Sequence, residues 1–335
     1  MIASAPDVDA MADAIAAGSP RALARGLTWV ETGGPRAEAL CARLYPRGGR
    51  AHVIGITGSP GGGKSTLVRA LARVARARDR HVGIIAVDPS SPFSGGAILG
   101  DRIRMNDLAL DPGVFIRSMA TRGALGGLAR ATADAVDLMD AAGWDPIFVE
   151  TVGVGQDEVD VMRLAETVIV VSVPGLGDDV QALKAGILEI ADIHVVNKAD
   201  RDGADRTQSD LRSMLHLLPH AEGAWLPPIL PTVAAREEGI DAVVAALDAH
   251  RAALAASGDG EARRRRNARA RVLQIAQGLL ADAMTHGDGG EPAALVEDVA
   301  RRALAPHAAA RMLLTMARAP GLSPAGTPRS REDGT

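Results

Sequence analysis

The chain has 335 residues, of which 47% are hydrophobic and 2% aromatic, and its formal net charge is −4. These values fit a folded protein with one main domain and some extensions. The negative charge and the scarcity of rings for base stacking argue against a nucleic-acid-binding function. The single cysteine, Cys41, cannot form an internal disulfide, which predicts a reducing, cytoplasmic location. No stretch is long and apolar enough to predict a membrane span.

Residues 1–50 predict short helices that form an N-terminal extension. Ser19 followed by Pro20 is a helix-start signal, because the hydroxyl caps the first turn and proline suits the first helical position. Apolar residues then recur at helical spacing. The extension contains no candidate catalytic group.

Six short apolar runs, rich in β-branched residues, follow from residue 51 onward and alternate with helical patterns. Continuous rather than alternating apolar runs are typical of parallel strands that are covered on both faces. The chain therefore predicts an α/β fold with a doubly wound, mostly parallel sheet over residues 51–256. The runs are 52–57, 82–87, 114–117, 147–152, 168–173 and 193–196.

A phosphate-binding loop is predicted at residues 55–66, where the sequence fits G-x-x-x-x-G-K-[ST] between a strand and a helix. Glycines let successive backbone N–H groups face phosphate oxygens. Lys64 is expected to reach the β- and γ-phosphates, and Ser65 to offer its hydroxyl to Mg²⁺. The predicted nucleotide contacts in this loop are Gly58, Pro60, Gly61, Gly62, Gly63, Lys64, Ser65 and Thr66.

Acidic residues occur at or beyond the carboxyl ends of the predicted strands, where ligands bind in sheets of this kind. Asp88 directly follows one predicted strand, and Asp101 follows in a loop rich in glycine and serine. Glu150 lies near the end of another predicted strand and is followed by flexible glycines. Carboxylates so placed can hold Mg²⁺ or its water. Together with Lys64 they are the candidate catalytic residues, and together with Ser65 the candidate metal ligands.

A base-recognition motif, N-K-x-D, directly follows the last of these runs. The carboxylate of Asp200 can accept two hydrogen bonds from guanine, a donor pair that adenine lacks. The stem of Lys198 can lie along the base, and Asn197 can tie loops together. A later loop offers the backbone N–H groups of Val233 and Ala234 to the guanine oxygen.

The C-terminal part predicts helices. An amphipathic helix is expected at 237–255, a linker at 257–260 and further helices in an arm over 257–318. The four arginines at 263–266 favour the solvated face of a packing helix over a nucleic-acid or membrane site. Residues 319–335 are rich in proline, glycine, serine and charge, which predicts disorder.

With these residues in view, the chain resembles the MeaB/ArgK family of P-loop GTPases, which are associated with adenosylcobalamin-dependent acyl-CoA mutases. The resemblance is densest between Gly55 and Asp200. Besides the motifs above, it rests on residues 88–91 with 95–105, 118–123 with 125–127, 150–156 and 174–186.

The resemblance implies roles for particular residues. Asp88, Asp101 and Glu150 match the acidic residues around Mg²⁺ and the attacking water. The stretches 88–101 and 150–156 are similar to the first two switches of the family. Residues 174–186 resemble a third switch that faces the mutase, and its polar candidates for partner coupling are Asp178, Asp179, Gln181 and Lys184.

The resemblance further implies a GTP-hydrolysing chaperone that gates cofactor loading onto the mutase and protects it. It implies Mg²⁺ and GTP as ligands and a homodimer through the C-terminal helices. The sequence itself indicates no cobalamin site. Two other classes stay open: a metal-delivery GTPase, which would carry Cys/His clusters, and a protein-targeting GTPase, which would need a Met-rich module.

Overall fold

A computed structural model describes residues 5–88, 107–120, 127–151, 162–175, 190–217, 224–286 and 293–317. By their contacts the residues divide into two compact units, Met1–Arg269 and Ala270–Thr335. The N-terminal helices therefore belong with the sheet. The domain limits at 50, 256 and 318 stay predictions of the sequence.

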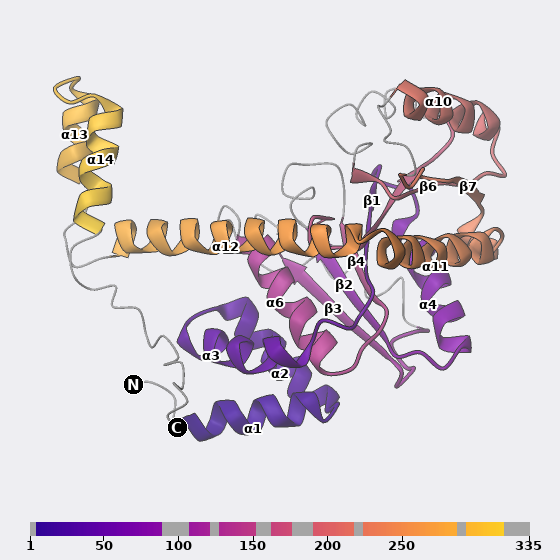
Figure 1. The fold of residues 1–335 in the computed structure, drawn as a ribbon, viewed down its shortest axis with the longest axis horizontal. Coiled ribbons are helices and arrows are strands. Elements are labelled where there is room, and N and C mark those ends of the chain that lie inside the picture. The colour runs from indigo at the N-terminus through magenta and orange to yellow at the C-terminus, as the bar shows by residue number, and fades with distance from the viewer. Residues whose placement is uncertain are drawn as a thin grey trace, which may run out of the picture. The chain divides into compact units, whose positions relative to one another are not determined.

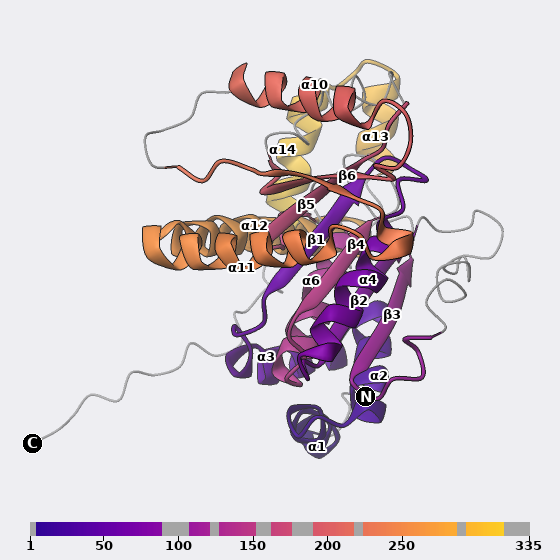
Figure 2. The same ribbon diagram turned by 90° about the vertical axis from the view of Figure 1, so that its right-hand side faces the viewer.

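The first unit contains a seven-stranded, all-parallel sheet in the order β3-β2-β4-β1-β5-β6-β7. Figure 2 shows this order from β3 to β6, and β7 is labelled beside β6 in Figure 1. This confirms the predicted doubly wound α/β fold. The strands are β1 (Val53–Gly58), β2 (Val82–Asp88), β3 (Val114–Ala120), β4 (Ile147–Thr151), β5 (Thr167–Ser172), β6 (Ile193–Asn197) and β7 (Ile229–Thr232). The first six correspond to the six predicted runs.

Helices cover both faces of this sheet (Figure 1). One face packs against α1 (Ala5–Ala16), α2 (Pro20–Thr32), α3 (Pro35–Leu44) and α6 (Gly127–Ala141). The opposite face packs against α4 (Lys64–Ala77) and α11 (Ile240–Ser257). The other helices among the described residues are α10 (Ala204–Leu217), α12 (Asp259–His286), α13 (Ala293–Ala300), α14 (Pro306–Ala317) and the 3₁₀ turns η1 (Tyr45–Arg47) and η2 (Ala234–Arg236).

The N-terminal extension is helical, as expected. Ser19 caps α2 by accepting a hydrogen bond from Ala22 N–H at 3.3 Å, and Pro20 occupies the first turn. Helix α1 lies ahead of the predicted cap and buries Val8, Ala12 and Ile15. These residues join the core on the α6 face of the sheet. Among the described residues, no helix has the length and apolarity that crossing a bilayer requires.

The junction between α11 and α12 corrects the expected linker at 257–260. Helix α11 ends at Ser257, and α12 already begins at Asp259. Gly258 adopts φ +78°, the left-handed conformation that commonly ends a helix. A single glycine therefore replaces the linker that the small residues suggested.

A buried polar network joins the amino-terminal ends of β5 and β6 to α11 and α12. The two terminal guanidinium nitrogens of Arg263 each donate to an oxygen of the Asp192 carboxylate at 2.7 Å, and His250 Nε2 lies 3.3 Å from that carboxylate. Burial by itself raises the pKa of Asp192, but the hydrogen bonds from Arg263 and His250 outweigh it, so the net shift is downward. Arg263 is therefore a half-buried ion-pair partner, whereas Arg264, Arg265 and Arg266 are exposed, as expected for a solvated face.

His194 is the second residue of β6 and is fully buried, and neither ring nitrogen has a hydrogen-bond partner among the described residues. Burial lowers the pKa of His194 to about 4. Histidines of the unfolded chain titrate near pH 6.5. As the pH falls, position 194 is therefore protonated in the unfolded chain before it is protonated in the folded protein. The contribution to stability is fully present above about pH 6.5 and is lost as the pH falls toward about 4.

We therefore expect His194→Leu to flatten the loss of unfolding free energy between pH 7 and pH 4. The wild type should lose roughly 3 kcal/mol through this group by pH 4, at about 1.4 kcal/mol per pKa unit. Urea unfolding at several pH values measures the difference, and His216→Leu on the exposed face of α10 is the control. Parallel pH profiles for wild type and His194→Leu would contradict the account.

Candidate nucleotide-binding site

The phosphate loop connects the carboxyl end of β1 to the first turn of α4. Gly58 has φ +133° and Gly63 has φ +86°, conformations that side chains rarely adopt. A Cβ on Gly58 would lie 2.0 Å from the carbonyl oxygen of Val171 on the neighbouring strand. The loop thus lies directly against β5, at the central position of the sheet where the strand order reverses.

Gly63 and Gly61 offer a matched test of this packing. A Cβ on Gly63 would lie 2.4 Å from Asn197 Nδ2, whereas nothing lies within 4 Å of a Cβ on Gly61, which also has positive φ. We expect Gly61→Ala to cost only the backbone strain, about 1–2 kcal/mol. Gly63→Ala should cost at least about 1 kcal/mol more because of the clash. Urea unfolding of both variants measures the difference, and equal losses would show that the contact with Asn197 is not formed.

Lys64 is 5% exposed and lies at the first position of α4. Its ammonium donates hydrogen bonds to the carbonyl oxygens of Gly58, at 2.8 Å, and Ser59, at 3.0 Å. A buried ammonium is costly unless its donors are satisfied, and the loop backbone satisfies it here. A positive charge is therefore held inside the loop, where the phosphates of a nucleotide are expected.

Ser65 and Glu150, two of the predicted metal ligands, are brought together. Ser65 Oγ donates to Glu150 Oε1 at 2.6 Å, and Glu150 is 4% exposed. Phe148 packs into the core on the α4 side, and Glu150, two residues along the strand, points to the same face. Mg²⁺ prefers oxygen ligands and uses few from protein, so a hydroxyl beside a carboxylate fits this ion. The described residues contain no cluster of three or more His, Cys, Asp or Glu that could hold another metal.

Asn197 fastens the phosphate loop to the loop that follows β7. Its Nδ2 donates to Gly62 O at 2.8 Å, and its Oδ1 accepts from Thr232 Oγ1 and from Ala234 N–H, both at 3.1 Å. The side chain is 2% exposed. One amide thus joins three segments that are far apart in sequence. The motif alone gave no sign of the partners Gly62 and Thr232.

Lys198 and Asp200 complete the base-recognition motif at the same edge of the sheet. Lys198 has φ +57°, and its Nζ donates to Gly61 O at 2.8 Å. Asp200 is exposed, and its Oδ2 lies 3.7 Å from a guanidinium nitrogen of Arg236 in η2. This pairing was not predicted, because Arg236 follows a strand that the sequence pattern did not reveal.

The loop after β7 corrects one expectation. Val233 N–H donates to Glu238 O at 3.1 Å, and Ala234 N–H donates to Asn197. Both groups that were expected to reach the guanine oxygen are therefore used within the protein. The sequence around the loop could not predict these hydrogen bonds, because the acceptor for Ala234 is Asn197 at the end of β6.

Several predicted residues lie outside the described part of the chain. Asp88 ends β2, but its side chain is not described. Two predicted nucleotide contacts do lie within the described part: Pro60 is exposed, and Thr66 is half-buried in the first turn of α4. The remaining predicted residues outside the described ranges are Asp101, Asp178, Asp179, Gln181 and Lys184.

The fold and this site define a P-loop protein with the GTPase fold. The sequence model of the family described as methylmalonyl Co-A mutase-associated GTPase MeaB matches residues 23–288. The chain belongs to this family, which confirms the resemblance seen in its motifs.

Individual proteins agree with this assignment. A Pyrococcus abyssi protein named as a GTPase is 47% identical over 319 residues, which cover 94% of this chain and 98% of that relative. The GTPase ArgK of Escherichia coli is 40% identical, over 72% of this chain and 75% of its own length. The crystal structure of an LAO/AO transport system kinase has a TM-score of 0.71 at 27% identity, and the match covers 93% of this chain and 98% of that one.

A further relative is named after methylmalonic aciduria. The mitochondrial methylmalonic aciduria type A homolog of Caenorhabditis briggsae is 35% identical over 277 residues, which cover 77% of this chain and 67% of that protein.

Proposed function

We propose that this protein is a Mg²⁺-dependent GTPase that acts as a chaperone of an adenosylcobalamin-dependent acyl-CoA mutase. The observation that carries the GTPase part is the triple hydrogen bonding of Asn197, because it holds the N-K-x-D motif directly against the phosphate loop. The family's description and the name of the methylmalonic aciduria relative support the mutase as client.

Guanine recognition falls to Asp200. Its carboxylate accepts hydrogen bonds from guanine N1–H and the 2-amino group, and adenine would leave it without donors. A guanidinium nitrogen of Arg236 lies 3.7 Å from this acceptor. Lys198, held to Gly61, lines the base site with its stem.

Asp200→Asn should convert the protein from a GTP to an XTP binder. An asparagine amide can donate to the 2-oxo group of xanthine but opposes the donors of guanine, so we expect GTP affinity to fall at least about 100-fold. XTP affinity should rise above that for GTP. Competition titrations with both nucleotides measure this, and Asp202→Asn in the same exposed turn is the control. Unchanged GTP preference in Asp200→Asn would contradict the assignment.

Hydrolysis would proceed by in-line attack of water on the γ-phosphorus. The bond between that phosphorus and the β,γ-bridging oxygen breaks, GDP leaves with the bonding electrons, and the water passes one proton to the released phosphate as it becomes its hydroxyl group. Lys64 neutralises charge on the phosphoryl oxygens, and Glu150 orients groups at the γ-phosphate end of the site. Ser65 and Glu150, with Asp88 and Asp101, are the proposed residues that would hold Mg²⁺. That ion would supply charge neutralisation at the phosphates.

We propose that the residues that couple this protein to the mutase are Asp178, Asp179, Gln181 and Lys184. The cobalamin cofactor would be bound by the mutase and not by this chain. We further propose a cytoplasmic homodimer formed through the C-terminal helices. Support for the dimer comes from large apolar side chains that the second unit exposes in the monomer, since such surface usually becomes buried on association. These residues are Val272, Leu273, Leu279, Val296, Met312 and Leu314.

A further inference from the structure

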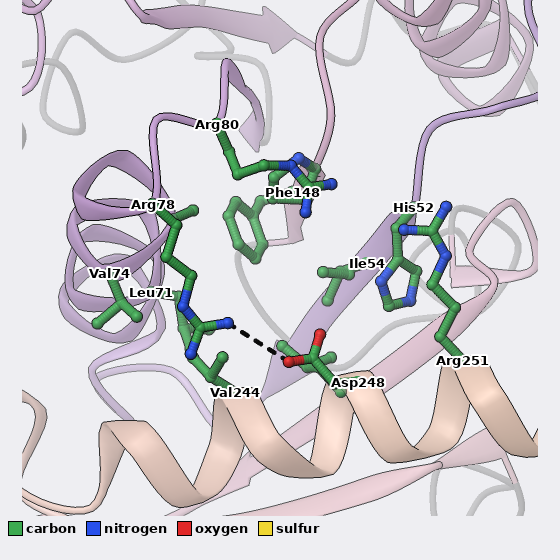
Figure 3. A pocket seen from close by; sticks show the side chains of 13 residues that line it. His52, Ile54, Leu71, Val74, Arg78, Arg80, Phe148, Val244, Asp248 and Arg251 are labelled. Carbon is green, nitrogen blue, oxygen red and sulfur yellow. Dashed lines mark hydrogen bonds and ion pairs between the residues drawn. The ribbon is translucent and has the colours of Figure 1, made fainter.

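A second cavity lies between α4 and α11, at the amino-terminal ends of β1 and β4 (Figure 3). Strand β1 separates it from the phosphate loop by about 15–20 Å at 3.3 Å per residue. Its floor is apolar. The floor consists of Ile54, Leu71, Val74, Ala75, Phe148, Val244 and Leu247.

Three arginines and a histidine surround this floor: Arg78, Arg80, Arg251 and His52. Figure 3 shows Arg78 on the α4 side and Arg251 beside His52, with Ile54 and Phe148 between them. The cavity volume is about 60 Å³. At about 10–15 Å³ for each water-sized sphere, this space admits roughly four to six non-hydrogen atoms.

The charges around the cavity do not cancel. Arg78 is paired with Asp248 at 3.4 Å, and Asp145 bonds to Arg80 and lies 3.9 Å from Arg251. Burial, and then the charge of Arg251, lower the pKa of His52 to about 4, so this ring is neutral at pH 7. Three arginines against two aspartates leave one positive charge.

Arg78 can be recruited at little cost. The side chains of Arg78 and Asp248 are 54% and 69% exposed, and an ion pair this exposed contributes about 0–1 kcal/mol, so exchanging Asp248 for a ligand costs little. Arg80 and Arg251 are each 44% exposed, whereas their partner Asp145 is 30% exposed and also accepts the backbone N–H of His52. Guanidinium groups match the planar fork of a carboxylate.

We propose that this cavity is a binding site for a short-chain organic monocarboxylate, with the alkyl part on the apolar floor and the carboxylate at the arginines. The single excess positive charge matches one negative charge on the ligand. The small volume excludes nucleotides, and the apolar floor disfavours fully hydrated inorganic anions. The site lies at the opposite end of β1 from the nucleotide and is independent of it.

The test uses butyrate as the probe and butyramide as its neutral counterpart of the same shape. We expect calorimetric titration to give saturable butyrate binding in the millimolar range, with butyramide at least about 10-fold weaker. Saturating GDP and Mg²⁺ should leave butyrate binding unchanged. The proposal would be overturned if butyrate did not bind, if butyramide bound as tightly as butyrate, or if GDP displaced butyrate. All three outcomes are measured on the wild-type protein.

Variants locate the site. Ala75→Leu fills the cavity from α4, and Arg251→Gln removes one charge from its rim. Each should weaken butyrate binding at least about 10-fold. Arg206→Gln, 89% exposed on α10, is the control for a lost surface charge. GDP titration verifies the fold of each variant. Butyrate binding at wild-type strength in a folded Ala75→Leu protein would place the ligand elsewhere.

Discussion

Replacing Asn197 by alanine should weaken the binding of both GTP and GDP at least about 100-fold and lower the unfolding free energy by about 2–4 kcal/mol. The change leaves the Gly62 carbonyl, the Thr232 hydroxyl and the Ala234 N–H without their shared partner. Each buried polar group left without a hydrogen bond costs about 1–3 kcal/mol, partly recovered by water. Nucleotide affinity falls because the phosphate loop and the base-recognition loops lose the side chain that joins them.

Calorimetric titration of GDP and urea unfolding together measure both effects of Asn197→Ala. Thr232→Val is the matched control, because it removes one of the three bonds and keeps the shape of the side chain. It should show a smaller loss on both scales. If Asn197→Ala bound GDP within about threefold of wild type, the amide would be a structural feature without a role in the site.

The second large effect concerns Lys64. We expect Lys64→Ala to lower kcat for GTP hydrolysis by about 10²–10³, the usual loss when one preorganised group that stabilises developing charge is removed. The ammonium is held inside the loop by the Gly58 and Ser59 carbonyls, so no solvent-exposed cation of α4 can replace it. Single-turnover phosphate release with saturating protein separates this loss from weaker binding.

Arg76→Ala provides the control for Lys64→Ala. Arg76 lies on the same helix, about 18 Å away at 1.5 Å per residue, and pairs with Asp111. Its loss should leave phosphate release unchanged. Release by Lys64→Ala within tenfold of wild type, in a protein that still binds GTP, would remove Lys64 from the chemistry.

The sequence predicted the parts of the fold that rest on local pattern. The apolar runs gave six of the seven strands within one to three residues, because parallel strands buried on both faces are continuous and β-branched. Strand β7 was missed and its end assigned to a loop. It is four residues long, lies at the sheet edge and contains Pro231, which weakens any strand signal.

Contacts between distant segments could not be predicted in the same way. The pairing of Asp192 with Arg263 joins residues 71 positions apart, and the arginine block alone favoured a solvated face. Likewise, the N–H of Ala234 was expected to meet the base, but Asn197 accepts it. The motif predicted which residues gather at the site, and the tertiary structure determines which of their hydrogen bonds are already made.

The most direct test of the proposed function is steady-state GTP hydrolysis, with ATP as competitor, measured with and without a purified adenosylcobalamin-dependent acyl-CoA mutase encoded in the same genome. The account predicts that ATP does not compete and that the mutase raises GTP turnover, and that Lys184→Ala removes this rise without changing basal turnover. Effective competition by ATP would contradict the guanine site at Asp200. A mutase that changes neither GTP turnover nor GDP affinity would contradict the chaperone role.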